Sequence, residues 1–268
     1  MKILLHDLSD WIFPRICYHC GERLESGLMA LCTLCRFYSY PLATRFPGIL
    51  PEPISRVQPL WVFEKGGSLR RLIHAMKYGG LPQIGHELGE CMGLQLLPDL
   101  FRDFQVDPWQ VLLLPVPLHP KKEKKRGYNQ ANLLCEGIQR IHSVHVAPDG
   151  WIVRRRFTRT QTGLSLEKRT QNLDQAFDMV ANLKETGFMT KTQFDAKIRR
   201  WIHREFTIPA PDLTQIKLIL LVDDVFTTGA TLFSLMKTLR EGLDEVNLVQ
   251  QRSEVIQFAG VTLAAGGW

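Results

Sequence analysis

The sequence predicts an α/β fold, a parallel sheet flanked by helices, with a small cysteine-rich module at its N-terminal end. Short apolar runs alternate with segments of helical apolar spacing, which is typical of a doubly wound sheet. The run at 218–222 has five apolar residues followed directly by two carboxylates, as expected of a buried strand. Two CxxC pairs indicate the separate module. We expect domains at 1–45 and 60–268, joined by a proline-rich linker at 41–59.

Composition limits the class of protein. The chain has 268 residues, a net charge of +6 and 45% apolar residues, which supports a packed core and excludes a disordered chain. The basic balance permits phosphate or nucleic-acid ligands without requiring them. No apolar run reaches the length of a membrane span, and the first 14 residues carry Asp7 and Asp10, unlike a signal peptide. We expect a cytoplasmic protein.

The order of predicted elements follows from apolar periodicity. Helices are expected at 69–77, 84–97, 131–141, 167–177 and 232–239. Strands are expected at 60–63, 111–114, 151–153, 218–222, 246–249 and 261–264. The segment 183–217 is an extension in front of the main strand. Its face with Phe194 and Trp201 fits a surface helix packed on the core, and its cations fit an appendage that binds DNA or a partner.

The segment 218–231 combines a strand, two acids, a hydroxyl-rich turn and the start of a helix. Ionised Asp223 and Asp224 only accept hydrogen bonds, which suits the vicinal hydroxyls of a ribose or a Mg²⁺ ion. A helix N-terminus attracts phosphate through its free N–H groups and partial positive charge. Adjacent carboxylates are costly to bury without a partner, which favours a sugar-phosphate site over an ordinary capped helix. The phosphate-binding turn consists of Thr227, Thr228, Gly229, Ala230 and Thr231.

The two CxxC pairs have the spacing of a Cys₄ zinc site, in which each pair supplies two thiolates to one tetrahedral ion. The alternatives are two disulfides, which would need an oxidising compartment, or a redox CxxC, which would not need a second copy. His19 could replace a ligand, but four thiolates already fill the coordination sphere. The predicted ligands are Cys17, Cys20, Cys32 and Cys35.

A cluster of cations follows the strand predicted at 111–114. Its position at the carboxyl end of a strand fits a polyanion such as pyrophosphate, although a charge run is also typical of a solvated surface loop. The predicted loop carries Lys121, Lys122, Lys124, Lys125 and Arg126. A second basic segment, 154–165, has no sustained period and fits a mobile loop that closes over a charged site or contacts nucleic acid.

The 218–231 segment resembles the ribose-phosphate motif of type I phosphoribosyltransferases. Over nearly its whole length the sequence further resembles the ComF family of competence-associated, phosphoribosyltransferase-like proteins. The residues that carry this resemblance are the four cysteines, Met76-Lys77-Tyr78-Gly79, Pro115-Val116-Pro117-Leu118, Arg126-Gly127-Tyr128-Asn129-Gln130 and the motif at 220–231.

The resemblance implies a ligand and further site residues. The ligand would be phosphoribosyl pyrophosphate (PRPP) or ribose 5-phosphate, bound with Mg²⁺. A pyrophosphate loop would contain Val116, Pro117, Leu118, His119, Lys121 and Arg126. A flexible loop would contain Arg156, Thr158, Thr160, Gln161 and Arg169. The partners implied are single-stranded DNA, a competence helicase and recombination proteins.

Three functions stay open on the sequence alone. The first is a PRPP-binding factor in DNA uptake, and the second is an active phosphoribosyltransferase with an unknown nitrogen acceptor. The third is a zinc-dependent interaction scaffold with a vestigial PRPP site, against which the intact acids and threonines count. No segment clearly recognises a base. Aromatic residues of the N-terminal module would either stack on bases or pack around the zinc: Tyr18, Phe37, Tyr38 and Tyr40.

Overall fold

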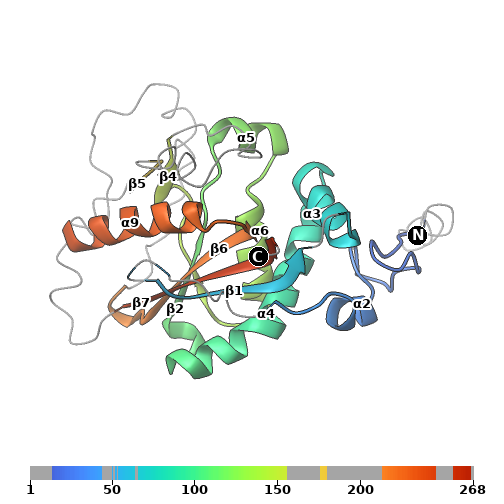
Figure 1. The fold of residues 1–268 in the computed structure, drawn as a ribbon, viewed down its shortest axis with the longest axis horizontal. Coiled ribbons are helices and arrows are strands. Elements are labelled where there is room, and N and C mark those ends of the chain that lie inside the picture. Colours follow the sequence, from blue (N-terminus) through green and yellow to red (C-terminus); the bar gives the residue numbers. More distant parts are fainter. Residues whose placement is uncertain are drawn as a thin grey trace, which may run out of the picture.

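The computed structural model describes residues 14–43, 50, 52, 54–63, 66–155, 176–179, 213–245 and 256–266. One sheet has helices on both of its faces (Figure 1). The strands of this sheet are β1 (Ile54–Phe63), β2 (Val111–Pro115), β3 (His145–Val146), β6 (Leu218–Phe226) and β7 (Gln257–Gly266). The helices are α2 (Thr33–Tyr38), α3 (Ser68–Tyr78), α4 (Pro82–Phe104), α5 (Pro120–Arg126), α6 (Gln130–Ile141) and α9 (Ala230–Glu245).

The five strands lie in the order β1-β7-β6-β2-β3, and every neighbouring pair is parallel. This confirms the predicted α/β class with a parallel sheet. The central strand β6 is longer than expected. It pairs with β2 only as far as Val222 but continues along β7 to Phe226. Asp223 and Asp224 therefore belong to the strand, at the level where its neighbour β2 has already ended.

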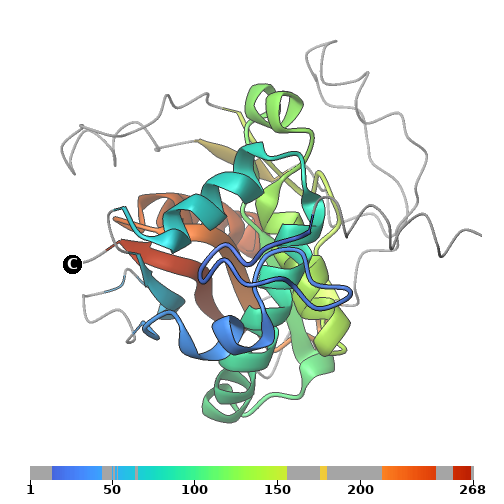
Figure 2. The same ribbon diagram turned by 90° about the vertical axis from the view of Figure 1, so that its right-hand side faces the viewer.

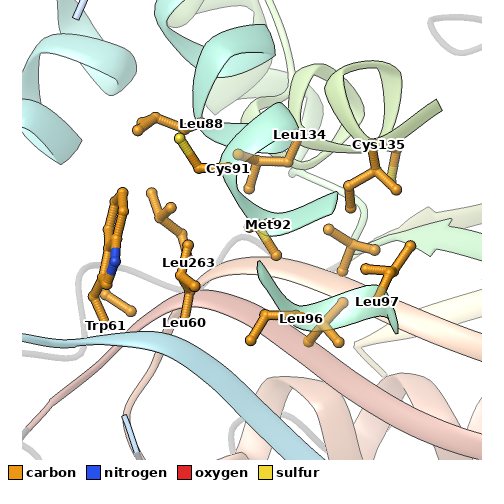
Figure 3. Packing of buried hydrophobic residues seen from close by; sticks show 14 of the residues in the cluster. Leu60, Trp61, Leu88, Cys91, Met92, Leu96, Leu97, Leu134, Cys135 and Leu263 are labelled. Atoms are coloured by element: carbon orange, nitrogen blue, oxygen red, sulfur yellow. The ribbon is translucent and has the colours of Figure 1, made fainter. Parts of the chain in front are cut away.

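Side chains of the central strands alternate between two apolar clusters, as the pleat requires. Leu218, Leu220 and Val222 face the cluster under α3, α4 and α6, whereas Ile219 and Leu221 face the cluster under α9. Figure 3 shows the first cluster, in which Cys91 and Cys135 pack among leucines. Both cysteines are buried, as the sequence predicts, and burial raises the pKa of the Cys91 thiol to about 12.

Glycines allow α4 and α6 to pack closely against each other. A Cβ atom at Gly89 would lie 2.2 Å from the Leu134 carbonyl oxygen, and one at Gly137 would lie 2.1 Å from the His86 carbonyl oxygen. Helix α6 lies over β2 and β6 while α4 lies over β1 and β7, so this close approach joins the two helices into one layer on the same face of the sheet. No helix among the described residues is long and apolar enough to cross a membrane.

Several elements differ from the sequence predictions. Strand β1 starts at Ile54, inside the expected linker, and tolerates Pro59 because it is an edge strand. Helix α4 runs through Pro98 to Phe104, beyond the predicted end at Leu97. The strand expected at 151–153 leaves the parallel sheet: β4 (Ile152–Arg154) pairs antiparallel with β5 (Phe177–Met179).

The remaining differences concern short segments. Phe177, predicted as the end of a helix, begins β5, and Ala176 before it is not helical; residues 167–175 of that predicted helix lie outside the described residues. So does the strand predicted at 246–249. Two short 3-10 helices precede strands, η1 (Pro108–Gln110) before β2 and η2 (Leu213–Gln215) before β6.

One buried carboxylate attaches the N-terminal module to the main layer. Glu87 on α4 accepts hydrogen bonds from the backbone N–H groups of Met29, Ala30 and Leu31 at 2.7, 3.1 and 2.9 Å. Its Oε1 atom also lies 3.1 Å from Arg36 Nη2, on α2. A carboxylate this buried is stable only when such partners surround it, so Glu87 ties the module to α4.

Glu87→Gln should lower the free energy of unfolding by about 2 to 4 kcal/mol, because Arg36 would lose its nearer anionic partner and keep only Glu90 at 3.8 Å, while three backbone N–H groups would lose a charged acceptor. Urea denaturation monitored by circular dichroism measures the change. Glu136→Gln is the matched control, since Glu136 is exposed and its loss should change stability by less than about 0.5 kcal/mol. Equal stability of the Glu87→Gln and Glu136→Gln variants would show that Glu87 does not hold the module.

Candidate functional site

The acidic pair lies at the carboxyl end of β6. Asp224 donates its backbone N–H to Asp223 Oδ1 at 2.8 Å. Its own carboxylate is paired with the cation of Lys77, whose Nζ lies 2.7 Å from Asp224 Oδ2. Lys77 comes from the last turn of α3, more than 140 residues earlier in the chain. The structure thus supplies a counter-cation that the sequence analysis did not assign to the site.

The environment of Asp223 disfavours its charged form. Burial and the adjacent Asp224 carboxylate raise the pKa of Asp223 to about 7, against the opposing effects of the Asp224 N–H, Lys77 and Arg154. Near neutral pH this carboxyl group is therefore poised between its two forms. A bound cation or hydroxyl donors at this position would favour ionisation.

The turn after β6 leads directly into α9. Gly229 has φ of 74°, and a Cβ atom there would lie 2.5 Å from the Phe233 ring, so the position requires glycine. The N–H of Phe233 donates to the Gly229 carbonyl at 2.9 Å and closes the first turn. Thr227 is exposed while Thr228 and Thr231 are partly exposed, which leaves these hydroxyl groups near the surface. The predicted turn is thus brought next to the acidic pair at one helix N-terminus.

The predicted pyrophosphate loop follows β2 on the neighbouring strand. Val116 donates its N–H to the Val222 carbonyl at 2.9 Å, and its own carbonyl accepts from Asn129 Nδ2 at 3.1 Å. Asn129 also caps α6, since its Oδ1 accepts from the Ala131 N–H at 3.2 Å. Pro117, Leu118 and His119 continue the loop and are all partly exposed. The loop is therefore anchored beside the residue that precedes Asp223.

The cations expected in a loop lie on a helix instead. Helix α5 starts at Pro120 behind His119, whose Nδ1 accepts from the Lys121 N–H at 3.1 Å. It ends at Gly127, which has φ of 87°. A proline in the first position and a left-handed glycine after the last turn favour a helix. These end signals outweigh the repulsion between neighbouring lysines.

Positive charges converge above the acidic pair. Burial and the cations of Arg154, Arg126 and Lys77 lower the pKa of Lys122, while Asp224 raises it. Burial, followed by Arg154, likewise lowers the pKa of His119. Arg154 is the last residue of β4, and its positive charge contributes to lowering the pKa of both Lys122 and His119. The sequence analysis placed Arg154 at the start of the mobile basic segment 154–165, whereas the structure places it in β4.

Two short motifs from different parts of the chain meet beside the site. The Tyr128 hydroxyl donates to the Met76 carbonyl at 2.7 Å, and Arg126 donates to the Tyr78 hydroxyl at 3.2 Å. The Arg126 guanidinium also lies 5.0 Å from the centre of the Tyr78 ring. These contacts connect α3 to α5 and so hold Lys77 in position.

The predicted flexible-loop residues, Arg156, Thr158, Thr160, Gln161 and Arg169, lie outside the described residues, as does most of the 183–217 extension. Only their flanks are described, where β4 and β5 form a hairpin. The contribution of these five residues to the site remains a prediction.

The cysteine cluster is formed as predicted. The sulfur atoms of Cys17, Cys20, Cys32 and Cys35 all lie within 4.8 Å of one another. A tetrahedral ion with Zn–S bonds of about 2.3 Å needs sulfur atoms about 3.8 Å apart, and Cys20 and Cys32 are 3.8 Å apart. Although burial opposes it, N–H groups of Cys20, Cys32 and His19 lower the pKa of Cys17 to about 7. The cluster can therefore bind a metal such as zinc.

The aromatic residues of this module divide into two groups. Tyr40 is buried, with its ring centre 4.8 Å from that of Trp61, and serves packing. Tyr18 is partly buried against the same core. Tyr38, by contrast, is 83% exposed, and Phe37 is 39% exposed. Packing around the cysteine cluster thus explains Tyr40 and Tyr18 but not the other two.

No family model matches the chain. It is 33% identical over 138 residues to Competence protein F of Haemophilus influenzae, covering 51% of this chain and 47% of that protein. It is 28% identical over 179 residues to DNA utilization protein YhgH of Escherichia coli K12, covering 61% and 77% of the two chains. The names of these two relatives support the resemblance to the ComF family. The matched segment spans about half the length of the Haemophilus protein.

A more distant relative matches a longer part of the chain. DNA utilization protein YhgH of Salmonella typhi is 24% identical over 241 residues, which are 84% of this chain and 91% of that protein. Similarity therefore extends beyond the sugar-phosphate motif. The names of these relatives indicate competence and DNA utilization as the role of the family.

Cys17→Ser or Cys35→Ser should lose bound metal and lower the thermal midpoint, because each removes one of four thiolates. Inductively coupled plasma mass spectrometry and a thermal melt measure the two effects. Cys91→Ala is the control and should retain the metal, since Cys91 packs in the core. Metal-free wild-type protein that is as stable as metal-loaded protein would contradict the assignment.

Asp223→Asn should stabilise the protein at pH 8 but not at pH 4. The folded protein holds the Asp223 proton up to about pH 7, whereas the unfolded chain releases it near about pH 4. Wild-type stability therefore falls as the pH rises through this window, and asparagine removes the loss. Because Asp223 is partly exposed, we expect a gain of about 1 to 3 kcal/mol above pH 7. An equal difference at both pH values, measured by urea unfolding, would refute the raised pKa.

Proposed function

We propose that this chain is a PRPP- or ribose-phosphate-binding, phosphoribosyltransferase-like protein that acts in DNA uptake and natural transformation in the cytoplasm. The observation that supports it most is the juxtaposition at the end of β6. An acidic pair suited to ribose hydroxyls lies beside a glycine turn at the start of α9, and cations of α3, α5 and β4 surround it.

The residues divide into three binding roles. Asp223 and Asp224 would hold the ribose hydroxyls, and the turn 227–231 would hold the 5′-phosphate through its N–H groups and hydroxyls. The loop 116–119 with Lys121, Lys122 and Arg126 would hold the pyrophosphate. Mg²⁺ would arrive with PRPP and neutralise part of its charge.

Electrostatic complementarity is the main contribution of the chain itself. Lys77 already neutralises Asp224, so the ligand-free site does not hold two unpaired acids. Ribose hydroxyls would donate to ionised Asp223, and this exchange favours release of its proton on binding. Binding should thus strengthen as the pH rises through about 7.

Transfer of the phosphoribosyl group to a nitrogen acceptor is the second candidate. The cations gathered above the acidic pair favour it, because they stand where negative charge would develop on departing pyrophosphate. A zinc-dependent scaffold with a vestigial PRPP site is the third. In each case the proposal includes structural zinc in the cysteine cluster, a module at 1–45 and a main domain at 60–268. Proposed partners are single-stranded DNA, a helicase and recombination proteins.

Calorimetric titration with PRPP and Mg²⁺ tests the proposal. Asp223→Asn with Asp224→Asn should abolish binding while the protein stays folded and keeps its metal. Asp99→Asn with Glu136→Gln is a control of equal charge on exposed residues and should bind like the wild type. Repeating the titration in buffers of different ionisation enthalpy counts the protons released. Wild-type affinity in the acidic-pair variant would refute the site assignment.

A further inference from the structure

An open groove lies between the cysteine module and α3, outside the PRPP site. It has a volume of about 400 Å³ and is lined by Tyr18, Arg70, Arg71, His74 and Ala75. The module closes one side of it, and His19 Nδ1 lies 2.8 Å from Ser68 Oγ at the start of α3. Figure 2 shows the blue module beside α3, with the green α5 beyond it. The groove is therefore built by elements that also lead to the site.

The outer face of α3 is basic and aromatic. Its sequence contains Arg70, Arg71, His74, Lys77 and Tyr78 but no acid. The two arginines and His74 are exposed, whereas the apolar residues of the helix are buried against the core. A helix with one buried face has no need of this concentration of positive charge on the other for its own stability.

The exposed rings of His74 and Tyr78 lie side by side, with their planes tilted by 47° to each other. The His74 and Tyr78 ring centres are 4.8 Å apart. The Arg126 guanidinium, which belongs to α5, lies 5.0 Å from the Tyr78 ring centre. Tyr78 remains 52% exposed. From Arg70 to Tyr78 the row is about 12 Å long, which matches about three stacked nucleotides. Arg126 ends the row and belongs to α5, where further lysines continue the positive surface.

We propose that this row, from Tyr18 and Arg70 along α3 to Tyr78 and Arg126, binds single-stranded nucleic acid and leads it towards the acidic pair. Cations that follow a groove neutralise phosphates, and exposed rings stack on unpaired bases. A duplex offers no unpaired base to His74 or Tyr78, so the single strand fits this surface better. The inference deepens the proposed role in DNA uptake and rests on it for the identity of the partner, while the surface itself is defined without PRPP.

Fluorescence anisotropy with a labelled oligothymidylate of about 20 nucleotides tests the surface on the full-length, metal-loaded protein. Arg70→Ala with Arg71→Ala should weaken binding about tenfold or more at low salt. It should also reduce the slope of log affinity against log salt by about 1.4, since two phosphate contacts are lost. Tyr78→Leu should weaken binding about five- to a hundredfold through lost stacking. Lys237→Ala with Arg240→Ala, which removes the same charge from α9 on the opposite face of the sheet, should have no effect.

The outcomes separate this inference from the proposed PRPP site. The Arg70 and Arg71 variant should keep wild-type PRPP affinity, and the acidic-pair variant should keep oligonucleotide binding. The proposed surface would be refuted if the wild-type protein bound no oligothymidylate. It would also be refuted if the α3 and α9 variants lost affinity equally. Equally tight binding of a duplex of the same length would overturn the single-strand preference. If PRPP did not bind while the α3 variants still weakened oligonucleotide binding, only the ribose-phosphate site would be refuted.

Discussion

The unequal length of neighbouring strands is the constraint on which the site depends. Strand β2 stops pairing with β6 at Val222, while β7 continues beside β6 to Phe226. Asp223 and Asp224 therefore lie in regular strand geometry but lack a neighbour on one side. That open side receives the loop after β2 and the cations of α3, α5 and β4. A β2 strand longer by a few residues would cover the acids with backbone and leave their charges without room for partners.

The negative charges of two adjacent acids need nearby cations, and these cations come from segments distant in the sequence. Lys77 reaches Asp224 from α3, and Arg154 acts on Asp223 from β4. Helix α3 is held in turn by Tyr128 and Arg126 on one side and by the cysteine module on the other. The module itself is fastened to α4 by Glu87. The His19–Ser68 contact, helix α3 and the Lys77–Asp224 pair thus connect the cysteine module to the acidic pair.

Sequence reasoning located the parts with a strong local signal. The CxxC pairs, the apolar strand before the acids, the glycine turn and helices α3 and α6 all lie where they were predicted. It was wrong for three segments: β1 occupies residues 54–59 of the proline-rich linker, α4 continues past a proline, and the lysine-rich loop is the helix α5. An edge strand needs no donor at Pro59, and the ends of α5 are capped. Strand β3 was not predicted, because its two residues are too few to show a periodic pattern.

The sequence by itself determined the α/β class, the cluster of four cysteines and the strand, acidic pair and glycine turn of the 218–231 segment, because each depends on residue type and spacing within a short stretch. Only the tertiary structure decided which cations serve the acidic pair and that the cysteine module and α3 share a groove. Those relations join residues separated by tens to hundreds of positions. Their distances follow from strand order and helix packing, which no local pattern contains.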